Sequence, residues 1–204
     1  TWNPAPASGS IWWRQLCARS GKPCVSTTVG CEGSPAWWTT SSTPLVAMVE
    51  TVAALIAADS ATRLYYVAYR NNAFDTHVHQ ADLHQRLLTY TSDAVSGFMQ
   101  DMERIGRADD VVVMIFSEFG RRVPENVSRG TDHGAANVMF VVGNKVKSGH
   151  YGEIPSLTAL TEGDNLAYTT DFRRVYQTMM QGWLGQRDTA DILNGDFGRF
   201  DMFV

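Results

Sequence analysis

Cysteine is scarce in this 204-residue chain, and all three cysteines, Cys17, Cys24 and Cys31, lie near its beginning. Their spacing of seven residues is wider than the close pairs typical of structural zinc sites. A zinc site built from cysteines is therefore not expected. Three cysteines confined to one part of the chain do not indicate whether the protein resides in a reducing or an oxidising compartment.

Positive charge and long apolar runs are also lacking. The formal net charge is −4 and the isoelectric point is near 5.7, so no basic surface that would follow a phosphate backbone is expected. No apolar run reaches the roughly 18 residues that a membrane span needs. No basic segment followed by an apolar one marks a signal peptide. Nucleic acid and membrane are therefore not expected as partners.

The composition changes near Pro44. Residues 1–44 hold five of the six tryptophans and five of the seven prolines, but no aspartate. No period of 2 or 3.6 persists there, so this leader is predicted to be irregular, with a short strand at 24–29. The hydrophobic content of 44 % predicts a globular domain for the remainder, 45–204.

Beyond Pro44 the hydrophobic pattern is regular, and apolar strands alternate with amphipathic helices. Such alternation predicts an α/β fold with a doubly wound, mainly parallel sheet. Asp171 or Thr170 is expected to cap the last helix, and Gly185 to follow its end. The predicted helices are 45–59, 81–106 and 171–184, and the predicted strands are 63–69, 110–116 and 137–142.

Polar clusters adjoin each predicted strand. The first strand runs into "NNAFDTHVHQADLH", the second runs into "SEFGRR", and "GTDHG" lies just ahead of the third. Ligands of doubly wound sheets bind at the carboxyl ends of the strands. The clusters are therefore candidates for one shared site.

Carboxylates and imidazoles are mixed in these clusters, which suits zinc, manganese or iron. Asp75 and His77 are two residues apart and would lie on one side of an extended segment, and His79 continues that alternation. One such histidine alone is more consistent with a solvated loop, but three clusters together favour a metal site. The candidate ligands are Asp75, His77, His79, Glu118, Asp132 and His133.

Two further residues have alternative interpretations. Arg121 could clamp a phosphate or sulfate anion with its guanidinium fork, or only form a structural ion pair. Ser117 could be a nucleophile with His133 as its base. However, Ile115 stands where the nucleophile elbow of serine hydrolases requires glycine. Ser117 is therefore expected to bond the loop backbone.

Four stretches together closely resemble the sulfatase-like family called domain of unknown function 1501, which is placed in the alkaline phosphatase superfamily. They are "FDTHVHQ", "VVVMIFSEFGRRVPEN", "GTDHGAANVMFVVG" and "TTDFRRVYQTMMQGWLG", and the resemblance covers about 45–204. It implies a doubly wound α/β sheet and a metal-dependent hydrolase of phosphate or sulfate esters.

The resemblance also implies roles for single residues. Asp75 and His77 look like the Asp and His that bind one metal of the superfamily, and His133 looks like its last metal-binding His, with Asp132 beside it. Glu118 stands for the Asp of an Asp-His pair, whose His is replaced by Phe119 in this chain.

The front of the chain departs from the superfamily, which takes another metal-binding Asp from its first strand and a Ser, Thr or modified Cys nucleophile soon after it. The first aspartate here is Asp59. We therefore expect the C-terminal part of a longer enzyme that lacks the first strands of the full fold. An uncovered sheet edge and apolar face would favour a homo-oligomer.

These observations predict a hydrolase that binds one divalent metal, zinc first and manganese or iron otherwise, and acts on a small-molecule phosphate or sulfate ester. A metal lowers the pKa of its water toward 7, so a protein nucleophile is not required. The alternatives are a carboxylic ester hydrolase, metal-assisted or using Ser117, and a catalytically inactive metal-binding fragment.

Overall fold

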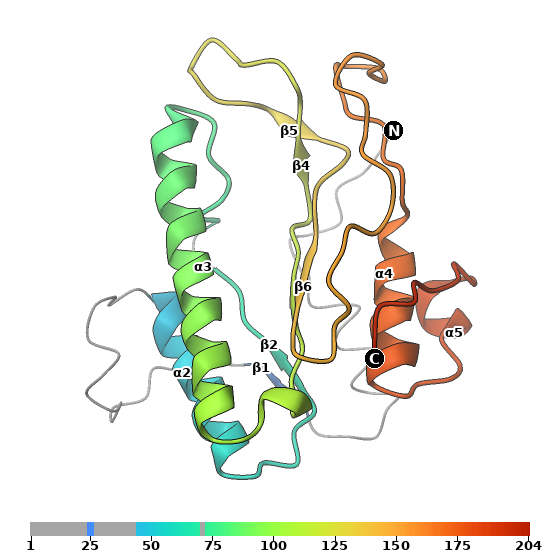
Figure 1. Ribbon diagram of the computed structural model, residues 1–204. Coiled ribbons are helices and arrows are strands. Elements are labelled where there is room, and N and C mark those ends of the chain that lie inside the picture. The colour runs from blue at the N-terminus through green and yellow to red at the C-terminus, as the bar shows by residue number, and fades with distance from the viewer. Residues whose placement is uncertain (1–23, 27–43, 70–71) are drawn as a thin grey trace.

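Two long helices pack side by side in the computed structural model, which describes residues 24–26, 44–69 and 72–204 (Figure 1). Helix α2 spans Pro44–Ala57 and begins at a proline, whose fixed φ suits the first helical position. Helix α3 spans Gln80–Arg104. Their contact forms the main core, whose buried residues are Val52, Ala53, Phe98, Met102 and Ala108. Both helices confirm the sequence prediction to within two residues at each end.

Within the described ranges, the strands form three separate two-stranded sheets. Strand β1 (Cys24–Ser26) pairs in parallel with β2 (Leu64–Tyr66). Strand β3 (Val113–Ile115) pairs antiparallel with β6 (Phe140–Val142). Strand β4 (Gly120–Arg121) pairs antiparallel with β5 (His133–Gly134).

The fold is therefore mixed α/β, but the predicted doubly wound, mainly parallel sheet is not seen among the described residues. The connection between β3 and β6 explains the difference. A parallel pair needs a crossover, usually a helix, and residues 116–139 contain none. The chain instead turns back through β4 and β5, so β3 and β6 run antiparallel.

The C-terminal part contains shorter helices. Helix α4 (Phe172–Thr178) continues as a π-helical turn, Met179–Trp183, so the predicted helix at 171–184 is present in two forms. Gly185 follows it with φ +70°, as expected for a residue just past a helix end. A short helix α5 (Ala190–Leu193) packs against this turn, and Ala108–Asp110 is a single 3₁₀ turn before β3.

Of the leader, β1 and Pro44, the first residue of α2, fall within the described residues, and β1 accounts for part of the strand predicted at 24–29. The rest of the leader lies outside them. No helix in the described part of the chain combines the length and apolarity needed to cross a bilayer.

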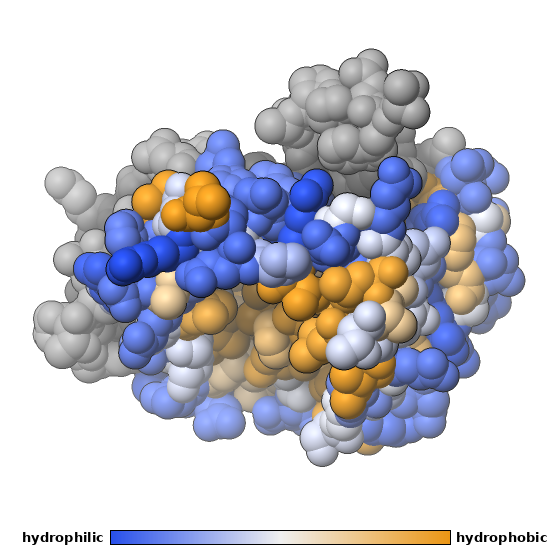
Figure 2. Space-filling view, turned by 90° about the horizontal axis from the view of Figure 1, so that it is seen from above, coloured by the Kyte–Doolittle hydropathy of each residue, from blue (hydrophilic) through white to orange (hydrophobic). Residues whose placement is uncertain are grey.

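Apolar side chains are exposed in several places. Figure 2 shows a group of them, bordered by hydrophilic side chains, on the end of the molecule viewed from above. Phe140 of β6 is 52 % exposed, and β6 pairs only with β3 in the described ranges. The predicted self-association stays a prediction.

The cap of α4 gives a prediction about stability. The Asp171 carboxylate accepts hydrogen bonds from the backbone N–H of Arg173 at 2.9 Å and from the Arg173 side chain at 2.6 and 2.9 Å. The bond from the Arg173 side chain is the main cause that lowers the pKa of Asp171. Asp171→Ala is therefore expected to reduce the free energy of unfolding by about 1 kcal/mol at pH 7.

Because the pKa of Asp171 is lower in the folded chain, its contribution is complete above the unfolded pKa of about 3.9 and disappears as the pH falls through the folded value. Urea unfolding of both proteins should show their difference shrinking below about pH 4. A difference that stays constant down to pH 3 would contradict the assigned role of this carboxylate.

Candidate metal centre

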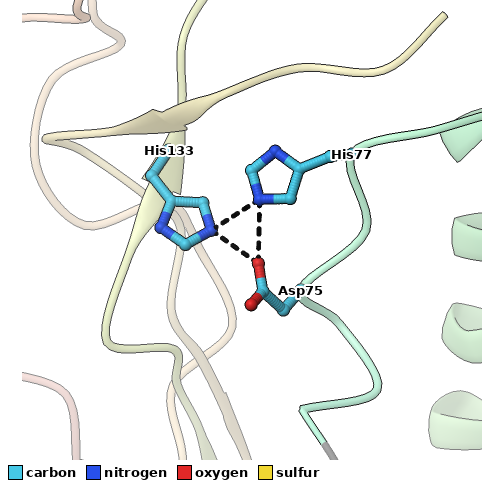
Figure 3. Close-up of side chains that lie close together, drawn as sticks. All are labelled: Asp75, His77 and His133. Atoms are coloured by element: carbon cyan, nitrogen blue, oxygen red, sulfur yellow. Dashed lines mark hydrogen bonds and ion pairs between the residues drawn. The ribbon is translucent and has the colours of Figure 1, made fainter. Parts of the chain in front are cut away.

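Two segments far apart in the sequence bring three of the six candidate ligands together (Figure 3). Asp75 and His77 lie in the connection between β2 and α3. A turn with Asn72 in the left-handed region (φ 48°) precedes them, and the Asp75 N–H donates to the Asn72 carbonyl. His133 comes from β5. At the other end of the connection, His79 is also left-handed (φ 45°) and begins α3.

Three atoms form a small triangle at the centre of the site. Asp75 Oδ1 lies 2.9 Å from His77 Nε2 and 2.7 Å from His133 Nε2, and the two nitrogens are 3.1 Å apart. The three side chains are 36–45 % exposed, so they are accessible from solvent. Asp75, His77 and His133 are thus a group that could hold a metal ion.

Hydrogen bonds alone do not satisfy this triangle. Hydrogen bonding to His133 is the main cause that lowers the pKa of the Asp75 carboxyl; partial burial opposes it, and hydrogen bonding to His77 lowers it further. The carboxylate is then ionised at neutral pH and can only accept. If Nε2 of His77 and Nε2 of His133 both carry protons, these two donors face each other. If one of them lacks its proton, that nitrogen and the carboxylate oxygen of Asp75 face each other as two acceptors. Every choice of tautomers leaves at least one unfavourable contact.

A cation removes that conflict, because all three lone pairs would point to it. Zinc binds imidazole nitrogen and carboxylate oxygen at about 2.0–2.2 Å, and atoms 2.7–3.1 Å apart can lie together on a sphere of that radius. Three protein ligands also leave a coordination position open, as in catalytic zinc sites. The residues present therefore fit a divalent metal.

Asp132 lies beside the triangle. Its Oδ1 is 3.8 Å from Nδ1 of His77, whereas His77 contacts the triangle through Nε2. Asp132 also accepts a hydrogen bond from the Asn126 amide at 3.3 Å. A carboxylate near the second nitrogen of a metal-binding histidine orients that ring. The geometry suits Asp132 to this supporting role.

The structure does not bring Glu118 or His79 into the group. Glu118 is exposed and lies near Tyr66, whose pKa is raised first by burial and then by the charge of Glu118. His79 is exposed at the start of α3. The ring of His84 contacts the Thr76 hydroxyl at 3.3 Å, outside the triangle, and burial lowers its pKa.

The Ser117 hydroxyl forms hydrogen bonds with the backbone of its own loop. The hydroxyl donates to the carbonyl of Phe119 at 3.0 Å and lies 3.4 Å from the backbone nitrogen of the same residue. This arrangement agrees with the expectation that Ser117 bonds the loop.

Two residues that were not among the candidates shape the site. Phe119 stacks on His133 with ring centroids 3.8 Å apart and planes at 10°. Asn126 donates its amide to the His77 carbonyl at 3.2 Å, and its side-chain oxygen accepts from the N–H of Ser128 and of Gly130. Asparagine commonly stabilises turns in this way. The position of Asn126 in a polar loop could therefore have indicated this role from the sequence.

Arg121 connects the two segments. It lies opposite His133 in the β4–β5 register. Its guanidinium donates to the carbonyl of Phe74 and to the carbonyl of Thr131, each at 2.7 Å. Burial lowers its pKa, although an arginine stays charged in proteins.

Comparison with known proteins gives one match. Residues 38–183 match a family described as "Protein of unknown function (DUF1501)". Neither the curated proteins nor the solved structures contain a match to this chain. The matched range includes β2, β5 and all three residues of the triangle. Since it covers well over half of the sequence, the chain belongs to the DUF1501 family.

Proposed function

We propose that the protein is a metal-dependent ester hydrolase of the alkaline phosphatase superfamily that acts on phosphate or sulfate esters. The observation that carries the proposal is the triangle of Asp75 Oδ1, His77 Nε2 and His133 Nε2, which a cation satisfies and hydrogen bonds do not. A bound divalent ion polarises an ester oxygen and activates water. Asp75, His77 and His133 would hold that ion, and their partial exposure would leave it accessible to solvent.

The charge of the ligand set favours an anionic ester. Asp75 supplies one negative charge and two neutral imidazoles supply none, so a divalent ion in this group keeps a net positive charge. The guanidinium of Arg121 adds a positive charge close to Asp75 and Asp132. Phosphate and sulfate esters carry negative charge that such a site attracts, whereas a neutral carboxylic ester gains less.

An ester panel tests this function. The zinc-loaded chain is expected to hydrolyse 4-nitrophenyl phosphate or sulfate faster than 4-nitrophenyl acetate, and to lose that activity in a chelator. Restoring zinc should restore it. Chelator-resistant hydrolysis of the acetate alone would support a carboxylic ester hydrolase instead. Zinc binding without hydrolysis of any ester would indicate an inactive metal-binding chain.

A further inference from the structure

Arg121 contacts both ligand-bearing segments without offering a ligand to the triangle. One of its acceptors is the carbonyl of Phe74, directly before Asp75, and the other is the carbonyl of Thr131, two residues before His133. We infer that Arg121 is a positioning residue that holds these segments together and thereby sets the metal affinity of the site. This inference rests on the proposed function, because it concerns the same metal group.

The strength of the two bonds supports this role. Hydrogen bonds from a charged donor are about twice as strong as those between neutral groups, and both are short at 2.7 Å. Apart from the triangle itself and the approach of Asp132 to His77, the other side-chain links between the segments are neutral. They run from the Asn126 amide to the His77 carbonyl at 3.2 Å and from the Thr131 hydroxyl to Gln80 at 2.8 Å. Arg121 thus provides the only hydrogen bonds from a charged donor among the described side-chain links between the two segments outside the triangle.

Arg121 also contacts the ring of His133 indirectly, through Phe119. Its guanidinium carbon lies 5.1 Å from the centre of the Phe119 ring, within the range of a cation–π contact. The ring of Phe119 also stacks on the ring of His133. Arg121 thus packs on Phe119, and Phe119 packs on His133. This stack fixes the plane of the His133 imidazole and therefore the direction of its Nε2.

This geometry differs from an anion clamp. Two of the five guanidinium N–H groups donate to backbone carbonyls, so the planar fork faces the protein chain. A substrate clamp would affect the KM for the ester but leave metal affinity unchanged. A positioning residue would affect metal affinity first. The two roles therefore separate in one experiment.

Zinc affinity should be measured by competition with a chromophoric chelator for wild type, Arg121→Lys, Arg121→Gln and Arg122→Gln. Loss of an outer-shell partner typically costs about 10–100-fold in metal affinity, and both Arg121 variants are expected in that range. Lysine is expected to fail because a single ammonium does not reproduce the fork. Arg122 is exposed and adjacent, so its variant should stay within about twofold of wild type.

A second measurement distinguishes the loss of the Arg121 contacts from general damage to the fold. Cobalt-loaded Arg121→Ala is expected to show an altered visible spectrum, and millimolar guanidinium should restore the wild-type spectrum by filling the vacated place. Wild-type zinc affinity in both Arg121 variants, with only the KM raised, would overturn the inference and leave the proposed function standing. A wild-type chain that binds no zinc would overturn both.

Discussion

Replacing His77 by alanine is expected to remove both zinc binding and ester hydrolysis. His77 Nε2 is one of only three atoms in the triangle, at 2.9 Å from Asp75 Oδ1 and 3.1 Å from His133 Nε2. Losing a ligand should cost more than the roughly 10–100-fold in affinity that an outer-shell partner costs. Zinc titration and steady-state hydrolysis of 4-nitrophenyl phosphate would measure the two losses.

Ser117→Ala is the matched control for this variant. Because the Ser117 hydroxyl donates to the Phe119 carbonyl, its removal should leave most of the zinc binding and activity in place. The opposite pattern would establish a serine mechanism: activity that survives a chelator and His77→Ala but disappears in Ser117→Ala.

Adding a single methyl group at Gly130 is expected to weaken zinc binding at least about tenfold. Gly130 is buried, and a Cβ there would overlap the carbonyl group of His77. Overpacking of this kind typically costs about 1–3 kcal/mol and moves the backbone. The segment that must move carries a ligand, and Asn126, which bonds both Gly130 and His77, would move with it.

Gly106→Ala separates this effect from general destabilisation. Gly106 has φ +71° and nothing within 4 Å of an added Cβ, so alanine there brings backbone strain far from the triangle. Its free energy of unfolding should fall while its zinc affinity stays at the wild-type value. If Gly130→Ala binds zinc as wild type does, the close packing of Gly130 on His77 does not control the site.

Local sequence signals predicted the helices well. An amphipathic helix was predicted at 81–106, and its apolar residues Phe98 and Met102 are buried. Two apolar residues nearer its start, Leu83 and Leu88, are 41 % and 57 % exposed. Helix α2 has 14 residues and α3 has 25, so α2 can cover only part of the apolar face of α3. Periodicity predicts the apolar face of a helix but not the length of its partner.

The arrangement of the strands was not predicted, although the sequence contained evidence against a parallel connection between the second and third predicted strands. Nothing between 116 and 139 has a helical pattern, and a parallel crossover without a helix is rare. The short pair β4–β5 is too brief for a period of 2 to be visible in the sequence. Strand pairing depends on contacts distant in the sequence, which no local pattern reports.

Local spacing predicted the pairing of Asp75 with His77 in the triangle, whereas the approach of His133 depends on a contact between distant segments. Asp75 and His77 are two residues apart, and side chains at that spacing share one side of an extended chain. The same rule explains Glu118. Adjacent residues of an extended segment point in opposite directions, and Phe119 stacks on His133, so Glu118 points elsewhere. The contacts of Arg121, Asn126 and Gly130 join distant segments, so only the structure could identify them.

The metal content of the purified chain tests the central claim most directly. Metal-free protein titrated with zinc is expected to bind one equivalent per chain, and cobalt should give the visible absorption of a low-coordinate site with nitrogen and oxygen ligands. His133→Ala should abolish both signals while its far-ultraviolet circular dichroism stays unchanged. A wild-type chain that binds no divalent metal, or binds it equally well without His133, would contradict the account.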